Sequence, residues 1–210
     1  METEHLFGFT IGSDVGHVGE KEAFLNVNGR SGKRDGSYAA ASKTIEFGIT
    51  PVENLHIAIG ASGSYHAIAG VSGVEDRNRF GPESVSLEMK FRLLDRIKAP
   101  FGLTVIVEPH LAWLEEVGGQ IVAKQAVEFK LAADQELLKD RLWAAFNMLY
   151  EPERVKPKLT DEVEKESTLG FSGALTAQLA NDIFLGAEAR YLRKYDGPIL
   201  NTFVGDALFV

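Results

Sequence analysis

The chain has 210 residues, a formal net charge of −8 and no cysteine. The negative charge argues against nucleic acid as a partner, because binding to phosphates requires clustered Lys and Arg. The lack of cysteine excludes disulfides, thiolate metal sites and cysteine nucleophiles. No apolar run reaches the roughly 18 residues of a transmembrane helix. We expect a single domain over residues 1–210.

The first 20 residues precede the regular pattern of the chain. The stretch from Met1 to His5 has neither the basic region nor the apolar core of a secretory signal. We expect that a signal peptide has been removed before it. The following residues Leu6 to Ile11 contain two phenylalanines and predict a lead-in, a plug or an additional strand.

From residue 22 onward the dominant signal is alternation of apolar and polar side chains. This period of two is typical of a β-strand with one apolar face. Several segments reach the roughly 9–11 residues that a tilted strand needs to cross a bilayer, whereas globular strands average about 5–6. We expect ten strands, near 22–28, 39–50, 55–66, 85–93, 101–113, 127–131, 142–150, 168–179, 183–191 and 201–210.

Three positions depart from the simple pattern. Pro109 interrupts an alternating segment and predicts a β-bulge, because proline cannot donate to the ladder. Lys43 falls on an otherwise apolar face, so its ammonium must reach the edge of that face. Residues 134–151 also fit an amphipathic helix; we favour strands there because the flanking segments require a hairpin.

The connections between the strands alternate in length. Short turns are expected near 51–54, 95–98, 133–136 and 180–182, and longer polar loops at 28–37, 69–83, 115–124, 151–167 and 193–200. Short turns at one rim and long loops at the other are the plan of outer-membrane barrels. Ten is an even number, as a closed single-chain barrel requires. Residues 1–20 would then lie on the periplasmic side.

In these features the sequence resembles bacterial outer-membrane β-barrels, particularly small alphaproteobacterial ones. The resemblance rests on the segments Leu6–Thr10, Ile45–Pro51 and Asn54–Gly60, and on the later long strands. It implies an all-β, antiparallel up-and-down transmembrane β-barrel of about 10–12 strands in the outer membrane of a Gram-negative bacterium. Phe209 is penultimate where such barrels usually end on an aromatic residue, and similar proteins suggest a further hairpin.

Charged side chains gather on the polar faces of the expected strands, which in a barrel face the lumen. Mixed signs on neighbouring strands predict either pairs that fill the interior or the lining of a narrow pore. We therefore expect a passive channel or a structural membrane protein whose partners are outer-membrane lipids and whose lumen admits small solutes or ions. The candidate lumen-lining residues are Glu88, Lys90, Arg92, Glu108, His110, Glu128, Lys130, Glu188 and Arg190.

Catalytic and metal chemistry have little support in the sequence. His56, His66 and His110 lack the spacing of a chelate, since residues at i and i+2 on one strand face lie about 6–7 Å apart. Ser84 and Ser86 supply hydroxyls, but no triad-like set is visible. We expect no enzyme activity, no cofactor and no metal, and rank an outer-membrane lipid hydrolase lowest.

The main alternative is a soluble, lipocalin-like barrel that binds a small hydrophobic ligand. In that case the faces invert, so that apolar side chains line a cavity and charges face water. Alternation alone does not separate the two barrels, because it is symmetric under exchange of the faces. Strand length and loop asymmetry favour the membrane. The charge-dense loop 151–167 is expected to be solvated.

Overall fold

The computed structural model describes residue 3 and residues 6–158, 162–181 and 183–210, and these residues form an all-β protein. No helix that could span a membrane occurs among them. The ten strands are β1 (Lys21–Ser31), β2 (Ser37–Val52), β3 (Leu55–Ala69), β4 (Arg77–Leu94), β5 (Gly102–Leu114), β6 (Ile121–Leu138), β7 (Leu142–Pro157), β8 (Glu164–Ala180), β9 (Ile183–Asp196) and β10 (Thr202–Phe209).

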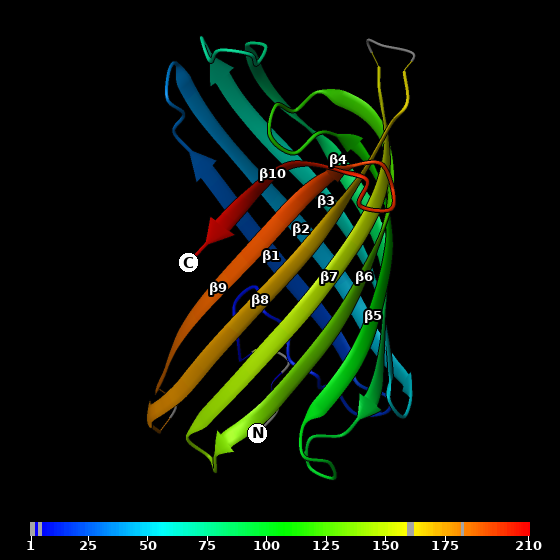
Figure 1. The fold of residues 1–210 in the computed structure, drawn as a ribbon, viewed down its shortest axis with the longest axis vertical. Coiled ribbons are helices and arrows are strands. Elements are labelled where there is room, and N and C mark those ends of the chain that lie inside the picture. The colour runs from blue at the N-terminus through cyan, green and yellow to red at the C-terminus, as the bar shows by residue number, and fades with distance from the viewer. Residues whose placement is uncertain (1–2, 4–5, 159–161, 182) are drawn as a thin grey trace.

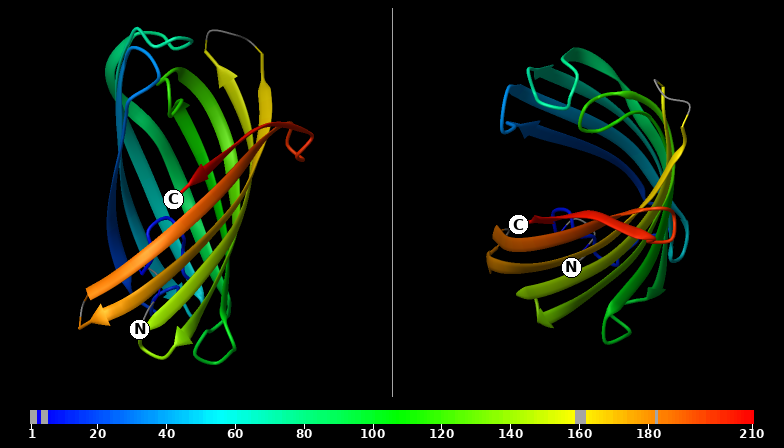
Figure 2. Two further views of the ribbon diagram at one scale, coloured as in Figure 1. Left: turned by 60° about the vertical axis from the view of Figure 1, so that its left-hand side comes forward. Right: turned by 45° about the horizontal axis from the view of Figure 1, so that its top comes forward.

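All ten strands belong to one antiparallel sheet in which neighbours in sequence are neighbours in space. The sheet curls into a half-barrel of steeply tilted strands (Figure 1). The all-β, up-and-down prediction is therefore confirmed. The expectation of a closed barrel is not met, since β1 and β10 lie at the two edges and are not paired with each other (Figure 2).

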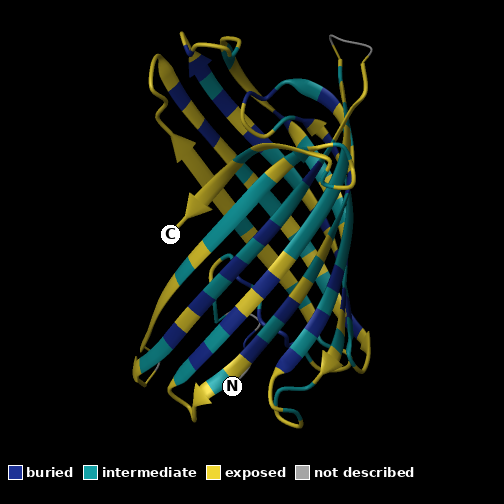
Figure 3. Cartoon of the chain, in the orientation of Figure 1, coloured by how far each residue is buried: buried dark blue, intermediate teal, exposed yellow. Residues whose placement is uncertain are grey.

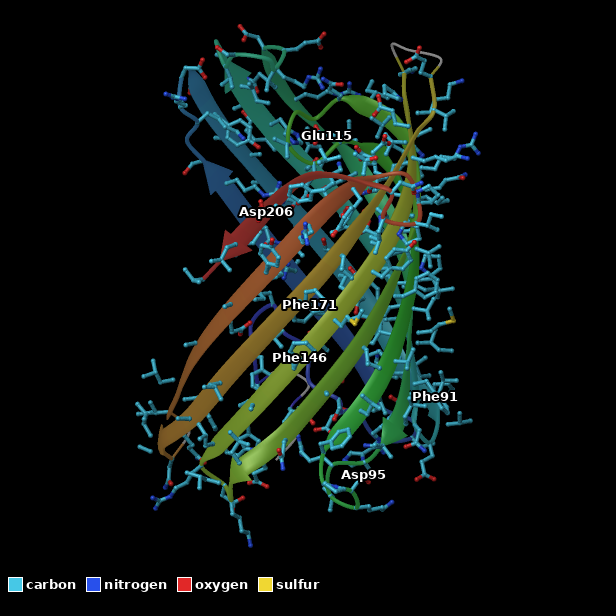
Figure 4. All side chains as sticks on the ribbon, viewed as in Figure 1. Phe91, Asp95, Glu115, Phe146, Phe171 and Asp206 are labelled. Atoms are coloured by element: carbon cyan, nitrogen blue, oxygen red, sulfur yellow. The ribbon has the colours of Figure 1, made fainter. Side chains whose placement is uncertain are left out.

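The connections fall into two groups, one at each end of the half-barrel. The end that carries the connections β2–β3, β4–β5, β6–β7 and β8–β9 is called here the short-turn end, and the opposite end the long-loop end. Asp95 lies at the first and Glu115 at the second (Figure 4).

The strands continue well into segments that were expected to be loops. The structure places long loops at residues 32–36, 70–76, 115–120 and 197–201. The connection between β7 and β8 contains residues 159–161, which lie outside the described residues. The expected turn at 133–136 is wrong, because those residues continue β6 and the turn follows at 139–141. Polar composition misled the prediction, since a strand rich in charges on one face resembles a loop in sequence. The short turn at 180–182 includes residue 182, which lies outside the described residues.

The structure also tests two local predictions, the bulge at Pro109 and the alternative helix at residues 134–151. Pro109 forms no bulge: it pairs with Val127, and the register between β4 and β5 is the same on both sides of it. The helical alternative for 134–151 is wrong, because these residues form the end of β6, a turn and most of β7. Neighbouring strands on both sides supply ladder partners there, and tertiary pairing outweighs local helix propensity.

The two faces of the sheet differ sharply in chemistry. On the convex face, apolar side chains are exposed along the strands, including Phe47 at 65%, Leu185 at 64% and Phe146 at 51%. Exposed residues alternate with more buried ones along the strands (Figure 3). Phe146 stacks on Phe171 of the neighbouring strand, with ring centroids 6.4 Å apart (Figure 4). The concave face carries most of the ion pairs, so the sheet is apolar outside and polar inside. The only cluster of buried apolar residues found among the described residues is small and surrounds Tyr38 and Ile68.

Candidate functional site: the charged interior

The segment before β1 lies against the concave face at the short-turn end and is called here the plug (described residues 3 and 6–20). None of its described residues is in a strand, so the option of an additional strand is wrong for them. Val15 and Ser13 are fully buried. Among the described residues, backbone–backbone hydrogen bonds join the plug to the sheet only at the end of the plug. There the amide of Gly19 donates to the Thr50 carbonyl at 2.8 Å, and the amide of Thr50 donates to the Glu20 carbonyl at 3.0 Å.

A buried cluster of carboxylates and one guanidinium fastens the plug. Asp134 on β6 accepts hydrogen bonds from the Ser13 amide at 3.0 Å and the Ser13 hydroxyl at 2.6 Å. Arg96, in the β4–β5 turn, lies 2.9 Å from Asp14 of the plug and 3.2 Å from Asp134. The Asp134 side chain is fully buried, and the guanidinium balances the two carboxylates. The plug is thereby tied to two neighbouring parts of the sheet.

A second anchor lies on β9 and β7. The Glu188 carboxylate accepts from three consecutive plug amides, those of Gly8, Phe9 at 3.0 Å and Thr10 at 2.9 Å. Asn147 holds the next residue in both directions: its oxygen accepts from the Ile11 amide at 2.7 Å, and its nitrogen donates to the Ile11 carbonyl at 2.8 Å. These side chains replace the ladder that the plug backbone lacks.

Close packing makes small residues necessary where the plug meets the sheet. A Cβ on Gly102, the first residue of β5, would lie 1.8 Å from the Ser13 hydroxyl and 2.5 Å from Asp134. Across the plug, a Cβ on Gly12 would lie 2.5 Å from the carbonyl of Thr3. The short-turn end is therefore filled by the chain itself.

Above the plug, residues that were predicted to line a lumen form short ion pairs on the concave face. Lys90 lies 3.2 Å from Glu88 on β4, and Lys130 lies 2.6 Å from Glu128 on β6. Glu108 is placed between them on β5, opposite Glu128. Acids and bases thus alternate along the middle of the interior.

The remaining candidates contact other partners. His110 lies 3.5 Å from Glu151 of β7. Arg92 donates to the Asn54 side chain at 3.0 Å and lies 3.9 Å from Asp14. Glu188 holds the plug, as described above. Arg190 is stacked between two rings, 5.0 Å from the centroid of Phe9 and 4.9 Å from that of Phe209.

The long-loop end is more open and more acidic. It contains a cavity of about 540 Å³ whose lining includes seven carboxylates, Lys124, Lys194 and His110. Lys124 is paired with Glu151 at 3.5 Å, and Lys194 with Glu153 at 3.7 Å. The loop 115–120 bends inward (Figure 2), and its first three residues line this cavity. Its carbonyls at Val117 and Glu116 accept from Tyr38 at 2.9 Å and contact His66 at 3.0 Å.

Histidines and serines that were weighed for chemistry occupy structural positions. His56 is buried, 3.3 Å from the Thr50 hydroxyl. The Ser84 hydroxyl lies 2.6 Å from that of Ser62. Within the described part of the chain, no group of three or more His, Asp or Glu is arranged to hold a metal ion. The absence of enzymatic activity stays a prediction.

The residues that fasten the plug were missed as a site. Asp134 was assigned to a turn, and Asp14, Arg96 and Asn147 received no role. The available signal was weak: Asp134 continues the polar alternation after Lys130. Its partner Ser13 lies 121 residues away, and no local pattern connects them.

The described chain is thus a ten-stranded half-barrel with an apolar convex face, a charged interior and an internal plug. A family model described as a family of unknown function (DUF6662) matches residues 1–207, and the chain belongs to that family. No curated protein and no solved structure matches the chain.

Proposed function

We propose that the protein is a β-barrel of a bacterial outer membrane that acts as a narrow passive channel or as a structural membrane protein. One observation carries the proposal: large apolar side chains are exposed on the convex face of almost every strand, while the ion pairs lie on the concave face. In water such a surface greatly exceeds the apolar patches of ordinary monomers. In a bilayer it is the surface that a transmembrane barrel presents to acyl chains.

The soluble, lipocalin-like alternative requires the opposite arrangement. A cavity for a hydrophobic ligand is lined mainly by apolar and aromatic side chains. Here the interior contains Glu88, Lys90, Glu128 and Lys130 in short pairs. Ile59 and Phe91, by contrast, are 64% and 50% exposed on the convex face. The distribution supports the membrane reading.

A bilayer also requires that the two free edges of the sheet be paired, because unsatisfied backbone groups are costly in hydrocarbon. Strand β1 runs from the short-turn end to the long-loop end, and β10 runs in the opposite direction (Figure 1). The two edges are therefore suited to an antiparallel ladder, and we infer that β1 pairs with β10 in the membrane.

The plug determines the ion conductance that we expect of the barrel. It fills the short-turn end and is held by Asp134, Glu188 and Asn147. The cavity at the long-loop end is lined by both signs of charge. We infer a low conductance for small ions with weak charge selectivity, which rises when the plug is released.

Membrane fractionation tests the location. The protein is expected to partition with the outer membrane and to show a heat-dependent shift in gel mobility in detergent. Recovery of a stable, folded monomer from detergent-free buffer would rule the proposal out. Planar-bilayer recordings then distinguish a channel from a structural protein, and a protein that lacks residues 6–18 is the matched sample for the effect of the plug.

Engineered cysteines test the closure, and the native chain has none to interfere. A series pairs a cysteine at Leu25 on β1 with one at Val204, Asp206 or Leu208 on β10. Within-chain closure predicts that one pair oxidises to a faster-migrating monomer. A disulfide-linked dimer in every pair would contradict closure within the chain. The pair of Leu25 with Phe146, on distant strands, is the control.

A further inference from the structure

A groove of about 790 Å³ crosses the convex face from β3 to β8, and its lining is overwhelmingly apolar. Leu87, Pro109 and Val127 form its floor on three consecutive strands, and Pro152 continues the same row on β7. The groove lies on the face that our proposed function places against acyl chains, and the inference below rests on that function.

Two prolines shape this groove. Pro109 and Pro152 lie on alternate strands on either side of Val127. Since proline has no amide hydrogen, the β4–β5 ladder has no pair at Leu87 and the β6–β7 ladder has none at Val127. Proline is unusual inside a sheet, and here two of them share one row. They produce a shallow channel in an otherwise regular surface.

The groove ends at two cations. Arg154 on β7 and Lys165 on β8 are directly opposite each other across the ladder, and both are exposed. Among the described residues neither has a carboxylate partner within ion-pair distance. Glu153 also borders the groove, but Lys194 lies 3.7 Å from its carboxylate. Like charges directly opposite on a sheet are destabilising without a counter-charge, so an anion between them is favoured.

The position of these cations fits the headgroup region of a bilayer. They lie near the long-loop ends of their strands, and Tyr150 on β7 donates to the Pro198 carbonyl of the β9–β10 loop beside them. Outward-facing aromatic residues form the girdles that flank the apolar band of a transmembrane barrel at the membrane interface. An apolar channel that leads from the bilayer core to two cations at the interface matches one ligand class, an acyl chain attached to a phosphate.

We propose that the groove is a binding site for a phosphate-bearing membrane lipid. One acyl chain lies along Leu87, Pro109, Val127 and Pro152, and the phosphate is bound between Arg154 and Lys165. Arginine and lysine are the side chains that bind phosphate, arginine in bidentate geometry. The phosphate thereby removes the repulsion between the two cations.

The test is lipid binding to the detergent-solubilised full chain, measured by native mass spectrometry. Phosphatidylglycerol is expected to bind more tightly than phosphatidylcholine of the same acyl chains, and glycerol phosphate without acyl chains is expected not to bind. The R154Q/K165Q variant is expected to lose roughly 30-fold in affinity for phosphatidylglycerol, because each of the two cations near an anionic lipid contributes a factor of about five to six in affinity. The control variant K43Q/K139Q removes two cations outside the groove and is expected to retain binding.

A second variant tests the acyl part of the site. V127F fills the groove without changing its charge. It is expected to weaken the binding of phosphatidylglycerol although Arg154 and Lys165 are unchanged. Equal binding of both lipids, or equal loss in R154Q/K165Q and K43Q/K139Q, overturns the lipid site and leaves the membrane location standing. Binding of glycerol phosphate alone would identify an anion site instead. Failure of the membrane proposal is recognised separately, by a folded protein in detergent-free buffer.

Discussion

The two ends of the half-barrel are built differently. At the short-turn end the interior is filled by the plug, whose amides and hydroxyls are bound by the buried Asp134 and the half-buried Glu188. At the long-loop end the interior holds a cavity, and the loop 115–120 is attached by two of its carbonyls and by an exposed ion pair between Arg30 and Glu116. Buried, fully paired polar groups are costly to break, whereas partly exposed pairs contribute little. The stability of the interior should therefore depend on the short-turn end.

Removal of the Asp134 carboxylate is expected to have the largest effect on this contrast. D134A leaves Arg96 without one of its two buried partners and Ser13 without its acceptor. The expected loss is about 3–5 kcal/mol in the free energy of unfolding, the range for breaking a buried ion pair. Urea unfolding in detergent or lipid vesicles measures it.

The matched control is E166A at the long-loop end, which removes a carboxylate paired with Lys194. Because that pair is partly exposed, the expected loss is at most about 1 kcal/mol. Equal losses in the two variants would show that the ends do not differ in the way that their burial suggests.

Removal of the Glu188 carboxylate is expected to have the next largest effect on how firmly the plug is held. E188A removes the acceptor of three plug amides, and a hydrogen bond to a charged group contributes about 1.5–3 kcal/mol. Residues 8–10 are expected to exchange their amide hydrogens faster, while the Ser13 amide stays protected by Asp134. The comparison variant is E128A, which removes an interior carboxylate that pairs with Lys130. Unchanged exchange at residues 8–10 would contradict the assigned anchor.

A glycine substitution separates packing from charge at the closed end. G102A forces a methyl group against the Ser13 hydroxyl and Asp134. Overpacking of this kind costs about 1–3 kcal/mol, and the plug is expected to become accessible to limited proteolysis. G29A on β1 is the control, because a Cβ there has no atom within 4 Å. A stable plug in G102A would mean that the contact relaxes without cost.

Much of the fold could be predicted from local pattern, and much of the site could not. Alternation located all ten strands because each has one apolar and one polar face, as in Val85 to Leu93. The alternation does not predict the strand ends where apolar and polar residues mix on the same face, as near Lys124 and Glu153. Asp134 lies on β6 and Ser13 lies before β1, so the two residues meet only after six strands have formed. Such a contact leaves no local signal in the sequence. Whether Arg190 stacks or pairs likewise depends on where the plug places Phe9.

The smallest effect expected concerns the pH dependence of local stability, and it compares one aspartate outside the interior at each end. At the long-loop end, hydrogen bonds from the Ser72 hydroxyl and amide lower the pKa of Asp35, and they join the β1–β2 loop to the β3–β4 loop. At the short-turn end, the Ile97 amide, 2.9 Å away, lowers the pKa of Asp95 within its own turn. A lowered pKa means that each contact is fully stabilising above the ordinary aspartate range and is lost as the pH falls through the lowered value. Amide exchange at Ser72 and Ile97, followed from neutral to acidic pH, measures both.

Protonation of Asp35 and protonation of Asp95 are expected to differ in how many backbone amides lose protection. Loss of the Asp35 contact separates two loops, so the amides of residues 70–74 should lose protection together with Ser72. Loss of the Asp95 contact leaves the turn held by the Lys98 and Ala99 amides, which donate to the Asp95 carbonyl at 3.0 and 2.8 Å. Only Ile97 should then respond. D35N should show the acid behaviour of the loops already at neutral pH. S72A removes the hydroxyl donor but keeps the amide that donates to Asp35, so it should weaken the pH dependence. A cooperative response at the short-turn end, or none at Ser72, would reverse the assignment of the weaker end.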